Sequence, residues 1–155
     1  MTLNEVKNLI APYVVKSTVC RIQYSSLERD LSGACYNEMI RRSIEAKLYG
    51  IYLWTVPDGR IVYCGKAGTV KNDGTYGKHA LCNRLVASRG KDKTTKIDES
   101  TFKFMFRFMH LQKIEFLDLH VFYTKDEVPP AYVESMVLFN YLKANSRLPT
   151  LNKSF

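Results

Sequence analysis

Hydrophobic and polar positions along the chain fall into segments with a strand-like or a helical period. Residues 50–56 are rich in β-formers and almost wholly apolar, which predicts a central strand. A second strand is predicted over residues 60–65, because Pro57-Asp58-Gly59 before it is a strong turn signal. The two strands therefore form a hairpin. Alternating apolar and polar residues over 114–123 predict a third strand.

Helical spacing of apolar residues predicts helices before, between and after these strands. A first helix carries Leu3, Val6, Leu9 and Ile10 and ends at Pro12, and further helices are predicted over residues 36–47, 78–88 and 131–144. The Phe-rich residues 101–111 fit a helix or a strand. We therefore expect an N-terminal helical extension, residues 1–46, followed by a domain of strands and helices, residues 47–155.

The chain carries an excess of positive charge. Lys and Arg total 23 against 15 for Asp and Glu, which gives a net charge of +8 and a pI near 9.3. Such an excess favours polyanionic partners, of which nucleic acid is the commonest. A composition of 46% hydrophobic residues excludes wholesale disorder, and no apolar run approaches the length of a membrane span. Without a signal-peptide layout at the N-terminus, we expect a soluble, cytoplasmic protein with no membrane partner.

The cysteines do not suggest a metal or redox motif. Cys20, Cys35, Cys64 and Cys82 contain no CxxC pair, and the three histidines do not complete a zinc spacing. Three of the four lie in apolar or semi-apolar segments. We therefore expect reduced cysteines, most of them in the core.

Two charged residues border apolar faces of predicted helices. Glu134 has Val137 and Leu138 as its i+3 and i+4 neighbours, so its carboxylate needs a metal ion or an arginine as a partner unless it leans into water. Arg84 either forms a structural ion pair or holds a phosphate through two donors. Taken singly, each residue is explained equally well by a structural role.

The order of several residues along the chain carries more information than each residue alone. The tripeptides Gly50-Ile51-Tyr52 and Tyr63-Cys64-Gly65, then a helical Arg84, a strand, a helical Glu134, and Asn152 after a proline, resemble the GIY-YIG nuclease family. Cys64 stands where the second tripeptide of the family has isoleucine. The resemblance covers residues 50–152 and is strongest to the small type II restriction endonucleases.

This resemblance implies an α+β fold with a small three-stranded antiparallel sheet flanked by helices, and the predicted elements agree with it. It implies a catalytic domain over residues 47–155, and we expect the extension of residues 1–46 to serve DNA contact or dimerisation. It implies hydrolysis of a DNA phosphodiester with one Mg²⁺ per site on Glu134, for which Mn²⁺ would substitute. Arg84 would neutralise the phosphate from another side. One tyrosine would take the proton of the attacking water; we assign this to Tyr52 and the orienting role to Tyr63, with the reverse assignment as the alternative.

Three further residues are expected to assist. Lys66, directly after the second tripeptide, is the expected cationic helper, and Lys78 is the second choice. Many family members carry Tyr or His one turn after the arginine, where this chain has Ser88, so His79 is a minority candidate for general base or phosphate donor. Asn152 is expected to tie the tail to the active-site helix.

DNA contacts are expected from basic segments of the same domain. The polar stretch after residue 65 predicts a long loop, and long loops are often functional. Its insert 69–77 resembles the restriction-enzyme branch. The predicted phosphate contacts are Lys71, Lys78, Arg89, Lys91 and Lys93. A single site cuts one strand, so a double-strand cut implies a homodimer or two successive events.

Three functions remain open at this point. The first is a metal-dependent, sequence-specific endonuclease of restriction type acting on double-stranded DNA. The second is a non-catalytic, phage or repair-type nucleic-acid-binding module with the same fold. The third is a small basic interaction protein, such as an inhibitor, in which the tripeptides occur by chance. Tyr52, Arg84 and Glu134 together favour the first, because a binding module has no physical need for all three.

Overall fold

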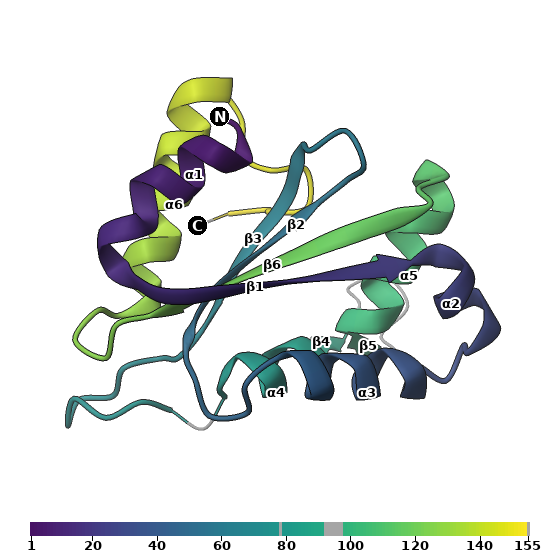
Figure 1. The fold of residues 1–155 in the computed structure, drawn as a ribbon, viewed down its shortest axis with the longest axis horizontal. Helices are drawn as coiled ribbons and strands as arrows, with labels where there is room; N and C mark the ends of the chain where they lie inside the picture. Colours follow the sequence, from purple (N-terminus) through teal and green to yellow (C-terminus); the bar gives the residue numbers. More distant parts are fainter. Residues whose placement is uncertain (78, 92–97, 155) are drawn as a thin grey trace.

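The computed structural model describes residues 1–77, 79–91 and 98–154 (Figure 1). Its elements, in chain order, are α1 (Leu3–Ile10), the 3-10 helix η1 (Ala11–Tyr13), β1 (Val14–Gln23), α2 (Tyr24–Arg29), α3 (Ala34–Ser43), β2 (Gly50–Thr55), β3 (Ile61–Ala67), α4 (Leu81–Val86), β4 (Ser88–Lys91), β5 (Asp98–Ser100), α5 (Thr101–Gln112), β6 (Phe116–Thr124) and α6 (Pro130–Asn145). A four-stranded antiparallel sheet in the order β1-β6-β2-β3 lies between two groups of helices, and β4 and β5 form a small second sheet.

Strand β2 lies inside the sheet, and all six of its residues are buried. Its side chains alternate between the two faces. Ile51 and Leu53 pack with residues of α1 and α6, whereas Tyr52 and Trp54 pack with residues of α3, α4 and α5. Figure 1 shows the same division, with α1 and α6 on one side of the sheet and α3, α4 and α5 on the other. Helices on both faces explain why β2 is a continuous apolar run in the sequence.

The prediction of an α+β fold is confirmed. The strands predicted over residues 50–56, 60–65 and 114–123 correspond to β2, β3 and β6, and the Phe-rich segment 101–111 is a helix, α5. Within the described residues, no helix is both long enough and apolar enough to cross a lipid bilayer. All four cysteines are free, and three of them are buried as expected, while Cys35 is exposed.

The sheet has four strands rather than the three that were expected. Residues 14–23 were included in a helical N-terminal segment, but they form β1, which pairs with β6 from Val14 to Gln23. The segment is rich in β-branched residues, which favour an extended backbone. Its first half is mostly exposed, and only Cys20 and Ile22 are buried. The N-terminal segment, residues 1–46, therefore contributes one strand, β1, to the sheet. Its first helix, α1, packs against α6 on one face of the sheet.

His120 is a buried titratable residue on β6. Its side chain is 7% exposed, and its Nε2 lies 3.1 Å from Oγ1 of Thr55. Within the described residues its Nδ1 has no hydrogen-bond partner. Burial lowers the pKa of His120 below its ordinary value of 6.5, the positive charge of Lys7 adds to this effect, and Asp118 opposes it.

The folded state therefore resists protonation of His120, and stability is expected to fall as the pH drops below 6.5 towards the lower pKa of the folded state. His120→Gln keeps a hydrogen-bonding group opposite Thr55 but does not titrate. We expect thermal melts of this variant to show a shallower decline of Tm between pH 6.5 and about pH 5 than the wild type. The exposed His110→Gln serves as a control that should leave the decline unchanged. An equally steep decline of Tm in His120→Gln would show that protonation of His120 does not cause the loss of stability.

Candidate active site

A pocket of about 230 Å³ lies beside β3, which forms one edge of the main sheet. We call it the β3 pocket. Five of the seven predicted catalytic residues line it together with the start of the loop after β3; the lining residues are Tyr63, Lys66, Ala67, Gly68, Thr69, His79, Arg84 and Glu134. The elements around it are therefore β3, its following loop, α4 and α6.

The edge position of β3 allows side chains from both faces of the sheet to reach one pocket. Tyr63 belongs to the core cluster under α3, α4 and α5, and Arg84 comes from α4 on that side. Lys66 has the same parity along the strand as Cys64, which packs against α6, and Glu134 comes from α6. The pocket therefore joins two groups of residues that an interior strand would separate.

Glu134 and Lys66 form an ion pair in this pocket. The Nζ of Lys66 donates a hydrogen bond to Oε2 of Glu134, and the two side chains are 38% and 14% exposed respectively. The partner of the helix-border carboxylate is therefore a lysine from β3 rather than water. Burial raises the pKa of the neighbouring Cys64 thiol well above its ordinary value, and the charge of Glu134 adds to this while Lys66 opposes it. Cys64 is accordingly a packing residue and not a thiolate ligand.

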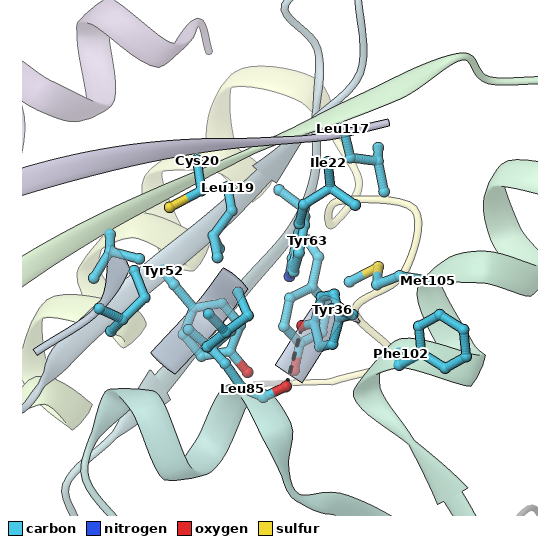
Figure 2. Close-up of a cluster of buried hydrophobic side chains, with 14 of the residues drawn as sticks. Cys20, Ile22, Tyr36, Tyr52, Tyr63, Leu85, Phe102, Met105, Leu117 and Leu119 are labelled. Carbon is cyan, nitrogen blue, oxygen red and sulfur yellow. Dashed lines mark hydrogen bonds between the residues drawn. The ribbon is translucent and has the colours of Figure 1, made fainter. Parts of the chain in front are cut away.

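The two hairpin tyrosines pack against each other on β2 and β3. Their ring centroids are 5.8 Å apart with an interplanar angle of 37°, and Figure 2 shows both rings among the buried side chains of this core cluster. Tyr52 is 1% exposed and is not among the pocket residues, whereas Tyr63 is 9% exposed and lines the pocket. Tyr63 is therefore the hairpin tyrosine that lines the pocket, and Tyr52 packs against its ring from within the core.

Gly65, the last residue of the second tripeptide, provides the space for both rings. Gly65 lies opposite Tyr52 in the strand register, and a Cβ at this position would lie 2.7 Å from Cζ of Tyr52 and 2.7 Å from Cε1 of Tyr63. Such distances require the rings or the strand to move. Packing therefore explains why glycine is needed at the end of the second tripeptide in this chain, because the rings of Tyr52 and Tyr63 occupy the space of a side chain there.

Arg84 and His79 border the pocket near α4. Leu81, Cys82 and Leu85 of this helix are buried, so Arg84 is left on its exposed side. Within the described part of the chain, no ion-pair partner is found for Arg84. His79 is exposed and lies just before the helix. Both side chains therefore border the pocket from a surface that solvent reaches.

Asn152 binds β3 and not the helix that carries Glu134, so the expectation of a tie to that helix was wrong. Its Oδ1 accepts from the backbone N of Cys64, and its Nδ2 donates to the backbone O of Cys64, both at 2.8 Å. The backbone N of Leu151 also donates to O of Val62 at 2.8 Å. The tail thus supplies hydrogen bonds along the outer edge of β3. The role of Asn152 is to position the strand that carries Tyr63 and Lys66.

The predicted DNA contacts are only partly described. Lys71 is exposed on the loop after β3. Lys78 and Lys93 lie outside the described residues, and for Arg89 and Lys91 the structure gives only their place in β4. The sequence reasoning missed the contribution of Gly68 and Thr69 to the pocket. Their position directly after the second predicted strand, next to Lys66, is the sequence feature that could have indicated a place in the pocket.

The β3 pocket fits a cation held by a single carboxylate. The described residues contain no cluster of three or more His, Cys, Asp or Glu side chains that forms a ready-made metal site. Glu134, however, already accepts the positively charged Lys66 on one oxygen, and the pocket has room for water beside it. Mg²⁺ commonly uses one or two protein carboxylates and fills its other positions with water and phosphate oxygens.

Comparisons of the chain with protein-family models, curated proteins and solved structures found no match. The resemblance to GIY-YIG nucleases therefore rests on the order of a few residues along the sequence.

Gly65→Ala is expected to destabilise the protein, because its methyl group would meet both tyrosine rings. Overpacking of this kind costs about 1–3 kcal/mol. Gly77→Ala is a matched control, because the nearest atom to its added Cβ is O of Thr69 at 3.4 Å. Urea denaturation measures both variants. Equal stability of Gly65→Ala and wild type would show that the rings are not held against this position.

Asn152→Ala is expected to loosen β3, since it removes both hydrogen bonds to the backbone of Cys64. The loss should be about 1–2 kcal/mol and local to this strand. Hydrogen exchange of the Cys64 amide should become faster, and the exposed Lys153→Ala should leave it unchanged. Unaltered protection of that amide would rule out the positioning role.

Proposed function

We propose that this protein is a metal-dependent endonuclease that hydrolyses phosphodiester bonds in double-stranded DNA, with the sequence-specific action of a restriction enzyme. The observation that carries the proposal is the convergence of Tyr63, Arg84 and Glu134 on one pocket of about 230 Å³. These residues come from a strand and two separate helices. The net charge of +8 supports a polyanionic substrate.

The cations of the pocket suit a phosphodiester. The guanidinium of Arg84 offers two parallel donors that match two phosphate oxygens. Lys66 lines the same pocket, supplies a second positive charge and is paired with Glu134. A phosphate bound by both cations would have negative charge on its oxygens stabilised during hydrolysis.

Glu134 is the residue that would hold Mg²⁺, with Mn²⁺ as its substitute. When bound, the ion would supply charge neutralisation at a phosphate oxygen and at the leaving oxygen. Lys66 would offer its ammonium group to the phosphate from the same pocket. Its ion pair with Glu134 positions the carboxylate in the pocket.

Tyr63 would orient the attacking water and accept its proton. Its side chain lines the same pocket as Lys66, Arg84 and Glu134. Tyr52 would support the ring of Tyr63 from within the core. His79, at the rim, would donate to the phosphate. A single pocket cuts one strand, so a double-strand cut needs a second copy of the chain or a second event.

Glu134→Gln is expected to reduce cleavage at least about 100-fold, because the amide keeps the shape of the carboxylate but loses its charge. The substrate is a mixture of long, unmodified plasmid and phage DNAs, so that many sequences are sampled. Cutting is followed by gel electrophoresis with Mg²⁺, with Mn²⁺, and with a chelator. Glu127→Gln, an exposed residue with the same change of charge, should cut as fast as wild type.

Two results would count against the proposal. Cleavage by Glu134→Gln at the wild-type rate would show that Glu134 does not hold the metal ion. Wild-type protein that retards DNA in a gel but never cuts it, with either metal, would instead support the non-catalytic binding module.

A further inference from the structure

The loop after β3 contains a short, well-braced ribbon, residues 69–77. Val70 and Tyr76 form an antiparallel bridge, the backbone N of Lys71 donates to O of Thr75 at 2.8 Å, and the backbone N of Gly77 donates to O of Thr69 at 2.8 Å. These bonds connect the two arms of the segment. Figure 1 shows the chain after β3 extending away from the sheet. The segment is thus a projecting two-armed ribbon rather than an irregular loop.

The base of the ribbon is anchored to the body of the protein by Tyr49. Its ring stacks on Tyr76 with centroids 4.4 Å apart, and its hydroxyl donates to O of Gly77 at 3.2 Å. The hydroxyl of Tyr76 in turn donates to O of Asp126 at 3.0 Å. Gly68, at the other arm, has a φ of 107° and would place a Cβ 2.9 Å from Cβ of Tyr49. Both arms are therefore fixed against one ring, which sets the direction in which the ribbon projects.

The ribbon begins at the rim of the β3 pocket. Gly68 and Thr69 line the pocket before the first arm, and His79 lines it after the second. Asn72 is three residues beyond Thr69. An extended chain advances about 3.3 Å per residue, so the tip lies about 10 Å from the pocket rim, comparable with the depth of about 8.5 Å of the B-DNA major groove. A ribbon of two strands also fits the width of that groove.

The tip presents side chains suited to DNA. Residues 71–75 are all exposed. Asp73 is used within the turn, because its Oδ1 accepts from N and Oγ1 of Thr75, and these hydrogen bonds lower the pKa of Asp73. Within the described residues, no hydrogen bond occupies the Asn72 amide or the Lys71 ammonium. An asparagine amide can pair with N6 and N7 of adenine, whereas the ammonium group of Lys71, on the first arm of the ribbon, can bind a phosphate.

We infer that the ribbon 69–77 enters the major groove beside the bond to be cut, where Asn72 reads an adenine and Lys71 binds the backbone. This inference rests on the proposed function, since the pocket defines where the scissile phosphate lies. It adds a specificity-determining residue that catalysis itself does not require. The base that Asn72 reads lies within a few base pairs of the cut, because the ribbon is short and starts at the pocket.

Two measurements test the inference. In the first, wild type and variants digest a pool of duplexes with a randomised segment, and sequencing of the new ends gives the base preference at each position around the cut. In the second, duplexes from the same pool are selected for binding by proteins that carry Glu134→Gln, so that binding preference is obtained without cleavage.

Three variants separate reading from positioning. Asn72→Ala should reduce a preference for adenine at one position about 10-fold to 100-fold. Asn72→Asp should move the preference at that position towards cytosine, because a carboxylate accepts from N4 of cytosine. Lys71→Ala should weaken binding to all sequences alike and reduce its salt dependence. The exposed Gln112→Ala, which also removes an amide, and Lys143→Ala are controls that should change neither preference nor affinity.

Each outcome has a distinct meaning. Cleavage with a base preference that Asn72→Ala and Asn72→Asp leave unchanged would overturn the inference while the proposed function stands. A binding preference that follows residue 72 without any cleavage would support the ribbon as a reader and contradict the nuclease. Neither binding nor cleavage by the wild type would overturn both. Circular dichroism melts identify any variant whose fold is lost, and the shift towards cytosine in Asn72→Asp cannot arise from such a loss.

Discussion

Strand β3 forms an edge of the main sheet, yet six of its seven residues are buried, and the backbone groups along its outer side need hydrogen-bond partners. The tail supplies them. Asn152 pairs with both backbone groups of Cys64, and Leu151 pairs with Val62, so a short segment near the end of the described chain replaces a fifth strand. The pocket depends on this arrangement, because a full neighbouring strand along β3 would separate Tyr63 and Arg84 from Lys66 and Glu134.

The same edge explains how a small protein assembles a polar site without exposing its core. Tyr63 has its ring in the cluster formed by α3, α4 and α5, while Lys66 reaches Glu134 on the opposite face. Tyr63, Lys66 and Glu134 are therefore carried by packed elements, whereas Thr69 and His79 reach the pocket from the connection between β3 and α4. Gly65 between Tyr63 and Lys66 removes the one side chain that would force the tyrosine rings apart. Packing on both faces of the sheet therefore sets the geometry of the site.

Much of this fold could be predicted from the sequence, because strands that are packed on both faces appear as apolar runs. β2 and β6 are buried on both sides and are strongly apolar, and the turn at Pro57-Asp58-Gly59 defines the hairpin. β1 was missed because its first half is exposed, so its burial does not produce a clear alternation.

The order of residues along the chain was enough to select Tyr63, Arg84 and Glu134 as candidate site residues, and these three line one pocket. The Lys66 partner of Glu134 could not be predicted, because the two are 68 residues apart and only the topology brings them together. Nor could the sequence show which tyrosine is closer to the pocket, since that depends on β3, and not β2, lying at the edge.

The other edge of the sheet has a consequence for how the protein behaves in solution. Among the described strands none lies beyond β1, which leaves a run of backbone donors and acceptors facing outward beside the exposed Val15 and Val19. Charged side chains commonly protect such edges from adhering to other chains. Here Lys16 and Arg21 are each engaged by an acid of the same molecule, Glu45 and Asp118, so their charge offers less protection than their number suggests. β1 is therefore an open edge with incomplete protection, of the kind to which a strand of another chain can add.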